Sequence, residues 1–354
     1  MPLRLLGRAV SGAIGRAGGA IGRASGAAGG VALEKGVAIN PVSTPVIVAS
    51  ERGEVGLAAG MELLRAGASA MDAVEAALRV AEANEADHYV GVGGLPNLLG
   101  EVELDASIMD GATRRAGAVG AVTGFPHPIS IARAVCDRLP QHLLLVGAGA
   151  ERFADEVGIE RGPTLTDEAR QMWRDGLEPA GLEAVAERHG EGEVAYRRQV
   201  IERIAAMAPP AGPWGTTNVL ALDAAGNLAA GVSTSGYPWK YPGRVGDSAL
   251  IGSGNYCDNR VGAAACTGRG ELAIRAGTAR AVLLALEAGH GPAEACAAAL
   301  AQTLDLPDEY RAPLQALCLT PDGRHGGAST RPGSTYSVLT ARDDSYRIEE
   351  RRQI

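Results

Sequence analysis

Four short segments in the second half of the chain carry the side chains with which this sequence could do chemistry. The first begins at Gly215 and places two threonines, Thr216 and Thr217, at the start of an apolar stretch. The other three set hydroxyl, guanidinium and carboxylate groups between glycines. They are Ser233–Gly236 (STSG), Gly243–Ser248 (GRVGDS) and Cys266–Glu271 (CTGRGE). These residue types indicate a nucleophile, a site for a charged ligand and a pair of hydrogen-bond donors.

The nucleophile that this pattern suggests is Thr216. A threonine hydroxyl reacts only when a base takes its proton, and an N-terminal threonine carries that base in its own α-amine, with a pKa of about 7.7–8.0. To expose this amine the bond between Gly215 and Thr216 has to break. Glycine favours such a cleavage because it can adopt strained backbone angles. Taken alone, the tripeptide is more typical of an ordinary strand start.

Thr234 is expected to lie beside Thr216. Residues 216–223 and 227–235 form a predicted hairpin around the turn DAAGN, and its register returns Thr234 to the start of the first strand. A hydroxyl there could form a hydrogen bond with the nucleophile.

Arg244 and Asp247 suggest a clamp for an amino acid. A guanidinium holds a carboxylate with two parallel hydrogen bonds, and an aspartate accepts from an ammonium group. The pair therefore fits an α-carboxylate and an α-amino group. Considered by itself, the segment is more typical of a surface turn with an ion pair.

Thr267 and Gly268 could form an oxyanion hole, since a hydroxyl and a backbone N–H that converge on one point stabilise a developing negative charge. Alone, the segment is more typical of a strand-to-helix turn with Thr267 capping the helix. No histidine lies near Cys266 in sequence, so we expect this cysteine to be a buried small residue rather than a nucleophile.

The composition excludes several other functions. The chain has 354 residues, is 46% hydrophobic and carries a net charge of −8, which indicates a large core and argues against nucleic acid or an anionic membrane as partner. The sequence contains no C-x-x-C or H-x-x-x-H spacing, so no metal site is expected. No apolar run is long enough to span a membrane. The segment LVGAGAER has Arg152 where a dinucleotide-binding motif needs its third glycine, so nucleotide binding is not expected there. The five cysteines predict a reducing compartment, so we expect a cytoplasmic protein.

The periodicity predicts the elements that position these groups. Apolar runs predict strands over 45–50, 103–111, 116–122, 216–223, 227–235, 248–255, 262–268, 312–320 and 334–341, the last two forming a hairpin. Helical spacing predicts helices over 54–67, 69–84, 128–139, 149–158, 165–176, 271–289 and 292–304, with Ser69 and Asp72 as a capping box. This pattern favours sheets packed face to face with helices outside.

Two segments stand apart from this pattern. Residues 1–40 are rich in arginine, glycine and alanine and contain no acidic residue before Glu34, which indicates a flexible arm, a start codon placed too early, or an export segment. Residues from about 186 to 214 are highly charged and end in prolines, which indicates a mobile linker.

The order and spacing of these segments resemble those of the asparaginase-type N-terminal-nucleophile hydrolases. This family includes glycosylasparaginase together with the plant-type asparaginases and isoaspartyl peptidases. The resemblance runs from about residue 45 to the end and is carried by GTTNVLALDAAGNLAAGVSTSG and PGRVGDSALIGSGNYCDNRVGAAACTGRGE. Upstream, SAMDAVE, VGVGGLPNLLGEVELDASIMDG and AGAVGAV are similar to the family's N-terminal half.

The resemblance implies an α+β fold, the four-layer αββα sandwich of two mainly antiparallel sheets known as the Ntn hydrolase fold. Residues 41–354 would form one domain, processed into an α subunit of about 41–215 and a β subunit of 216–354. Two such pairs would assemble as (αβ)2, with no cofactor and no metal.

The resemblance also implies roles by position. Cleavage would occur between Gly215 and Thr216, with Thr216 as nucleophile and Thr234 supporting its hydroxyl. Arg244 and Asp247 would bind the substrate's α-carboxylate and α-amino group. The oxyanion hole would consist of the following two residues: Thr267 and Gly268.

The expected activity is hydrolysis of the side-chain amide of an N4-substituted asparagine, such as glycosylasparagine, with release of aspartate. Isoaspartyl peptidase or L-asparaginase activity is the alternative, because Gly215 precedes the nucleophile as in that branch and Ser50 or Glu51 replaces an expected tryptophan. By contrast, VGVGGLPNLLGE resembles glycosylasparaginase more closely. A different class remains open, namely a non-catalytic module that binds an amino acid through Arg244 and Asp247.

Overall fold

The structure is a computed structural model that describes residues 43–177, 215–310 and 312–354. The predicted arm over 1–40 and the predicted linker over about 186–214 lie outside the described residues. The described residues all belong to one compact unit.

Two sheets organise the described residues. The first has eight strands in the order β12-β11-β1-β5-β6-β2-β3-β4, and the second has five in the order β13-β10-β9-β8-β7. The strands of the first sheet are β1 (Val46–Ser50), β2 (Leu104–Asp110), β3 (Ala116–Val122), β4 (Leu144–Val146), β5 (Thr217–Leu222), β6 (Leu228–Thr234), β11 (Thr335–Thr340) and β12 (Arg347–Glu350). Those of the second are β7 (Asn255–Asp258), β8 (Gly262–Gly268), β9 (Leu314–Leu319), β10 (His325–Ser329) and β13 (Arg352–Gln353).

The two sheets pack face to face because each strand offers one apolar side to the other sheet. Val48, Leu220 and Val232 of the first sheet share a buried cluster with Ala265 and Leu317 of the second. All neighbouring strands are antiparallel except the pairs β3–β4 and β10–β13. Two mainly antiparallel sheets therefore form the middle of the molecule.

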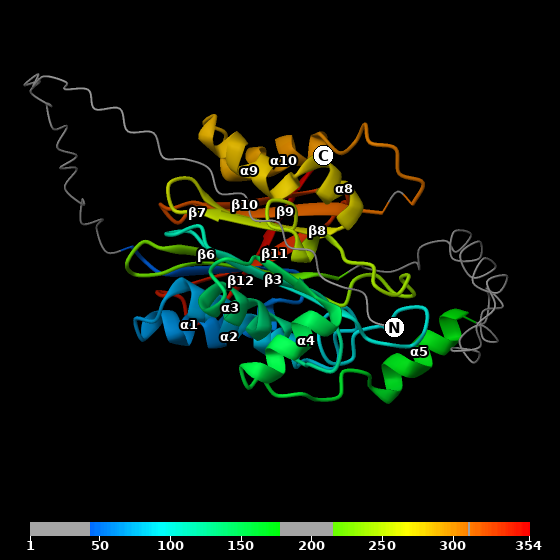
Figure 1. Cartoon of the computed structure of the whole chain (residues 1–354). Helices are drawn as coiled ribbons and strands as arrows, with labels where there is room; N and C mark the ends of the chain where they lie inside the picture. The colour runs from blue at the N-terminus through cyan, green and yellow to red at the C-terminus, as the bar shows by residue number, and fades with distance from the viewer. Residues whose placement is uncertain (1–42, 178–214, 311) are drawn as a thin grey trace, which may run out of the picture. The chain divides into compact units, whose positions relative to one another are not determined.

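Helices cover the outer face of each sheet (Figure 1). The first sheet carries α1 (Glu54–Arg65), α2 (Ala70–Glu82), α3 (Pro128–Arg138) and α4 (Gly147–Glu156). The second sheet carries α8 (Gly270–Ala276), α9 (Thr278–Glu287) and α10 (Pro292–Ala301), and α5 (Asp167–Leu177) ends the first described range. The layers are helices, sheet, sheet and helices, which confirms the predicted αββα sandwich.

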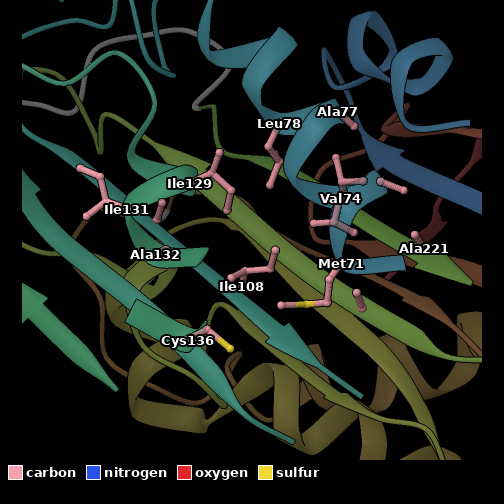
Figure 2. Close-up of a cluster of buried hydrophobic side chains, with 14 of the residues drawn as sticks. Met71, Val74, Ala77, Leu78, Ile108, Ile129, Ile131, Ala132, Cys136 and Ala221 are labelled. Atoms are coloured by element: carbon pink, nitrogen blue, oxygen red, sulfur yellow. The ribbon is translucent and has the colours of Figure 1, made fainter. Parts of the chain in front are cut away.

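Helix α2 illustrates how the sequence sets this packing. Ser69 caps it, since the Ser69 hydroxyl accepts from the Asp72 N–H at 3.2 Å and the Asp72 carboxylate accepts from the Ser69 N–H at 3.3 Å, as predicted. Val74 and Leu78 then face β6, where Gly231 leaves room for them. Figure 2 shows α2 and α3 side chains meeting on this face of the sheet, with Ile108 of β2 among them.

The predicted helix over 271–289 is interrupted, which corrects the sequence analysis. Gly277 adopts a left-handed conformation with φ of 60°, which ends α8 and starts α9 in a new direction. Apolar spacing continues across the break, so periodicity alone did not reveal it.

The predicted strand over 248–255 is also wrong. A short 3-10 turn, Asp247–Ala249, comes first, and β7 begins only at Asn255. Between them Gly252 has φ of 95°, and a Cβ atom on Gly254 would lie 2.3 Å from the Asp247 carbonyl oxygen. These glycines form a tight loop rather than an extended strand.

The predicted hairpin of 312–320 with 334–341 joins strands that lie in different sheets. β9 pairs with β10, while β11 crosses to the first sheet and pairs with β1. Gly326 and Gly327, between the two predicted strands, belong to β10, where Gly326 packs directly against the start of α10. The short final strands β12 and β13 were not predicted.

None of the helices within the described ranges has the length and apolar character needed to cross a membrane.

Replacement of Leu78 by alanine tests the packing of α2 on the first sheet. Leu78 is fully buried, so the substitution is expected to lower the free energy of unfolding by about 2–5 kcal/mol. Val80→Ala is the matched control, because Val80 lies on the same helix with 38% of its surface exposed, and its effect should stay within about 0.5 kcal/mol. Urea denaturation measures both, and equal losses would contradict the described packing.

Candidate active site

Thr216 and Thr234 lie side by side at the same end of two neighbouring central strands of the first sheet. Thr216 precedes β5, Thr234 ends β6, and the register pairs Thr217 with Ser233. The Thr216 hydroxyl donates to the Thr234 hydroxyl across 3.4 Å. An O–H···O hydrogen bond is usually no longer than about 3.0 Å, so this contact is loose and leaves the Thr216 hydroxyl able to turn.

The carbonyl of Gly215 is held by Thr234. The Thr234 hydroxyl donates to the Gly215 oxygen at 3.0 Å and accepts from the Gly236 N–H at 3.0 Å. The Tyr89 carbonyl is a second acceptor at 3.3 Å. Because one hydroxyl has a single proton, the nearer Gly215 carbonyl is the better partner, and this hydrogen bond polarises the bond before Thr216.

Residue 215 has to be glycine in this arrangement. A Cβ atom there would lie 2.4 Å from Cβ of Tyr89 and 2.6 Å from its Cγ. Tyr89 in turn lies under Arg52, whose guanidinium carbon is 4.8 Å from the ring centre and which forms an ion pair with Asp87 at 3.1 Å. This packing fixes the peptide that precedes Thr216.

Ser50 lies on the other side of Thr216. Its hydroxyl donates to the Thr216 carbonyl at 3.2 Å and accepts from the Asn218 N–H at 2.9 Å. From the sequence, Ser50 is expected only as a departure from the family pattern, and neither Asn218 nor Tyr89 is predicted to lie at the site. Strand periodicity could have found Asn218, since it lies two residues after Thr216 and so on the same side of β5.

Thr267 and Gly268 bring the second sheet to this point. They end β8, and the Thr267 hydroxyl lies 3.4 Å from the Thr216 carbonyl oxygen and accepts from the Asn218 amide at 2.7 Å. Gly268 has φ of 120°, and a Cβ atom there would lie 2.1 Å from the Pro313 carbonyl oxygen. No residue other than glycine fits at that position without moving the backbone.

Arg244 occupies the loop between β6 and β7 and is bound to Glu271. Its Nε and Nη2 atoms donate to the two oxygens of Glu271 at 3.0 and 2.9 Å, and its guanidinium lies 4.6 Å from the ring centre of Tyr237. Burial disfavours the charged guanidinium, but the ion pair outweighs it and raises the pKa of Arg244. Burial also acts to raise the pKa of Glu271, and Arg244 lowers it.

Asp247 is a buried carboxyl group with an unused oxygen. Its side chain is 4% exposed, and among the described residues its Oδ2 has no hydrogen-bond partner. Burial raises the pKa of Asp247 to about 7, although Arg244 acts in the opposite direction. A cationic group placed beside Oδ2 would stabilise the ionised form.

The loop that carries Arg244 and Asp247 is held by charged residues of β2 and the segment before it. Glu103 accepts from the Gly243 N–H at 2.8 Å, and Asp105 accepts from the Gly246 N–H at 3.0 Å. The fully buried Lys240 donates to the Glu103 carbonyl at 2.9 Å. Burial lowers the pKa of Lys240, while the Asp105 and Glu103 carboxylates oppose that shift.

The residues predicted to form a clamp, Arg244 and Asp247, lie near the predicted oxyanion pair, Thr267 and Gly268. A Cβ atom on Gly270, two residues after Gly268, would lie 2.6 Å from Asp247 Oδ1 and 3.1 Å from Arg244 Nη2. All of the predicted site residues therefore gather at one end of the sandwich, from both sheets. Cys266, next to Thr267, is buried, and burial raises its thiol pKa well above the usual value, which makes it a poor nucleophile.

Within the described residues, no group of three or more histidine, cysteine, aspartate or glutamate side chains is arranged to hold a metal ion.

Comparisons with known proteins agree on one family. The asparaginase family profile matches residues 46–344. The isoaspartyl peptidase/L-asparaginase of Mus musculus is 38% identical over 244 residues, covering 68% of this chain and 67% of that protein. The isoaspartyl peptidase of Salmonella typhimurium is 39% identical over 239 residues, covering 67% of this chain and 71% of that protein. The N(4)-(beta-N-acetylglucosaminyl)-L-asparaginase of Elizabethkingia miricola is 33% identical over 293 residues, covering 80% of this chain and 78% of that protein.

Fold and similarity together define a hydrolase that acts on amide bonds. The chain belongs to the asparaginase family of N-terminal nucleophile hydrolases, in which autoproteolysis is a general property. The resemblance inferred from the sequence is confirmed at this level.

The raised pKa of Asp247 predicts how stability depends on pH. Between its usual value of 3.8 and about 7, the folded protein keeps a proton that the unfolded chain has lost, so the free energy of unfolding falls as the pH rises through this window. Asp247→Asn is expected to remove this slope and to be more stable than the parent above pH 7. Asp175→Asn, exposed on α5, is the control, and an unchanged slope in Asp247→Asn would contradict the assignment.

Proposed function

We propose that this protein cleaves itself before Thr216 and then hydrolyses β-aspartyl amides, releasing aspartate. The observation that carries the proposal is the hydrogen bond from Thr234 to the Gly215 carbonyl, with the Thr216 hydroxyl next to it. A polarised carbonyl and a free hydroxyl on adjacent residues are the two groups that an N-to-O acyl shift requires.

In the first reaction, Thr216 Oγ1 attacks the Gly215 carbonyl carbon. The Thr234 hydroxyl stabilises the negative oxygen that forms, the C–N bond breaks, and the nitrogen takes up the hydroxyl proton. The result is an ester between Gly215 and the Thr216 oxygen. Water hydrolyses this ester, which gives a chain that ends at Gly215 and one that begins at Thr216 with a free α-amine.

In the second reaction, this amine takes the Thr216 hydroxyl proton, directly or through water. The deprotonated oxygen attacks the side-chain amide carbonyl of a bound asparagine derivative. The C–N bond then breaks, the Thr216 ammonium returns the proton to the substituted nitrogen, which leaves as an amine, and a β-aspartyl ester remains on Thr216. Water then releases aspartate. In this second reaction, the Thr267 hydroxyl and the Gly268 N–H are proposed to stabilise the tetrahedral intermediates of ester formation and of ester hydrolysis. Loss of one such donor typically costs about 10²–10³ in rate.

Arg244 and Asp247 are proposed to hold the aspartyl part of the substrate. Glu271 uses the Nε and Nη2 atoms of Arg244, so the α-carboxylate is expected at the edge that includes Nη1. The α-ammonium is expected beside Oδ2 of Asp247, where it would lower the pKa of that carboxyl group. The empty hydrogen-bonding capacity of Asp247 supports this assignment.

The candidate substrates differ in the group on the leaving nitrogen, and N4-glycosylated asparagine is the first candidate. The similarity to the Elizabethkingia miricola protein covers 80% of this chain and supports it. Isoaspartyl dipeptides or free asparagine are the second candidate, favoured by the higher identity to the Mus musculus protein and by Gly215 before the nucleophile.

We further propose that the two products stay together and pair as (αβ)2. The five cysteines are buried and unpaired, which supports the cytoplasm as the proposed compartment.

Replacement of Thr216 by alanine tests the cleavage. The parent protein is expected to show two bands on a denaturing gel, one of them with the N-terminal sequence Thr-Thr-Asn-Val. Thr216→Ala should remain one chain without activity, because it lacks the attacking oxygen. Thr217→Ala is the control and should still be cleaved. An uncleaved parent, or an active Thr216→Ala protein, would refute the proposal.

A comparison of three substrates tests the leaving group. We expect kcat/KM to be highest for glycosylasparagine, lower for a β-aspartyl dipeptide and lowest for asparagine. Aspartate release measures all three reactions equally, since the acyl part is the same. A higher value for the dipeptide would assign the second candidate instead.

A further inference from the structure

We infer that Asn218 is a positioning residue that orients the Thr267 hydroxyl so that its hydrogen points toward the reacting carbonyl. The inference rests on the proposed function, because it concerns the same reaction. Asn218 would support the proposed oxyanion pair, Thr267 and Gly268, without touching the substrate itself.

Asn218 connects the two sheets at the site. It is the second residue of β5, is 1% exposed, and its Nδ2 atom donates to the Cys266 carbonyl at 3.0 Å and to the Thr267 hydroxyl at 2.7 Å. Both acceptors belong to β8 in the second sheet. The shorter of these hydrogen bonds is the one to the proposed oxyanion donor.

The chemistry of the partners fixes the orientation of the amide. The Cys266 carbonyl can only accept a hydrogen bond, so the Asn218 atom that faces it has to be nitrogen. The same nitrogen faces Thr267, whose oxygen therefore accepts. Because the Thr267 hydroxyl has one hydrogen, that hydrogen has to point away from Asn218.

Thr216 lies on the side to which this hydrogen is free to point. The Thr267 oxygen is 3.4 Å from the Thr216 carbonyl oxygen, which is longer than the usual O–H···O distance of about 3.0 Å or less. The hydrogen is thus directed at the main-chain carbonyl of Thr216 across a long and weak hydrogen bond. A negatively charged oxygen that forms there would find a donor already oriented, which lowers the cost of reorganisation.

The oxygen at the other end of the Asn218 amide has room for a further partner, as does the oxygen of Asn255. Among the described residues the Oδ1 atom of Asn218 is buried without a hydrogen-bond partner. Buried polar atoms are nearly always paired, and an exception marks a place where water or a ligand supplies the partner.

The test combines two substitutions at Asn218 with one at Thr267. Asn218→Ala frees the Thr267 hydroxyl to rotate and should lower kcat about tenfold with KM within about twofold, since only the transition state loses stabilisation. Asn218→Asp puts an acceptor beside the hydroxyl and should lower kcat about a hundredfold, close to the loss of a whole donor in Thr267→Val.

A double-mutant cycle separates positioning from a role in stability. In the Thr267→Val background, Asn218→Ala should have no further effect on kcat beyond about twofold, because its target is gone. Asn255→Ala is the matched control: Asn255 is also a buried asparagine that joins the sheets, with Nδ2 donating to the Ser107 hydroxyl at 2.6 Å, and its removal should lower stability and leave kcat unchanged.

Cleavage before Thr216 distinguishes failure of this inference from failure of the proposed function. Asn218→Ala and Asn218→Asp should still be cleaved, because Thr234, not Thr267, binds the Gly215 carbonyl. A multiplicative loss in the double mutant, an unchanged kcat in Asn218→Asp, or an uncleaved Asn218→Ala protein would overturn the inference alone. An uncleaved parent would overturn the proposed function.

Discussion

The pairing of β5 with β1 on one side and β6 on the other is the constraint on which the site depends. Its register places the end of β1, the start of β5 and the end of β6 next to one another, so that Ser50, Thr216 and Thr234 meet at the ends of these three strands. A shift by one residue would turn every one of these side chains to the opposite face. Apolar residues of β5 and β6 that are buried between the sheets prevent such a shift. The packing of the core therefore sets the positions of the hydroxyls.

Electrostatics add a second level of order. The carboxylates of Glu103 and Asp105 bind backbone N–H groups of the loop that carries Arg244 and Asp247. Burial of these charges is costly, and the buried ammonium of Lys240 compensates part of that cost. Asp247 is the member of this cluster that is least well paired. Such a group is costly to the free protein and useful to one that has to bind a cation.

Local geometry in the sequence predicted that Thr216 and Thr234 lie together, whereas the grouping of the other site residues with them was expected only from the resemblance to the family. The hairpin of β5 and β6 has a short turn and a strong alternation, so the neighbourhood of Thr216 and Thr234 followed from local geometry. The ion pair of Arg244 with Glu271 did not follow, since the two residues are brought together by tertiary packing. The helix break at Gly277 and the transfer of β11 to the first sheet were missed for related reasons. Apolar spacing continues through the first, and the choice between two sheets depends on contacts that are distant in sequence.

The strand order of the first sheet has a consequence for the protein after its proposed cleavage. In the order β12-β11-β1-β5-β6-β2-β3-β4, β1 from before residue 215 lies between two strands of the later segment, β11 and β5. On the other side of β5, β6 of the later segment pairs with β2 of the earlier one. Strands of the two products would therefore stay hydrogen-bonded to one another within the same sheet. The two chains could separate only if these strand pairs were broken. Cleavage of one peptide bond would therefore give two chains that remain one folded unit.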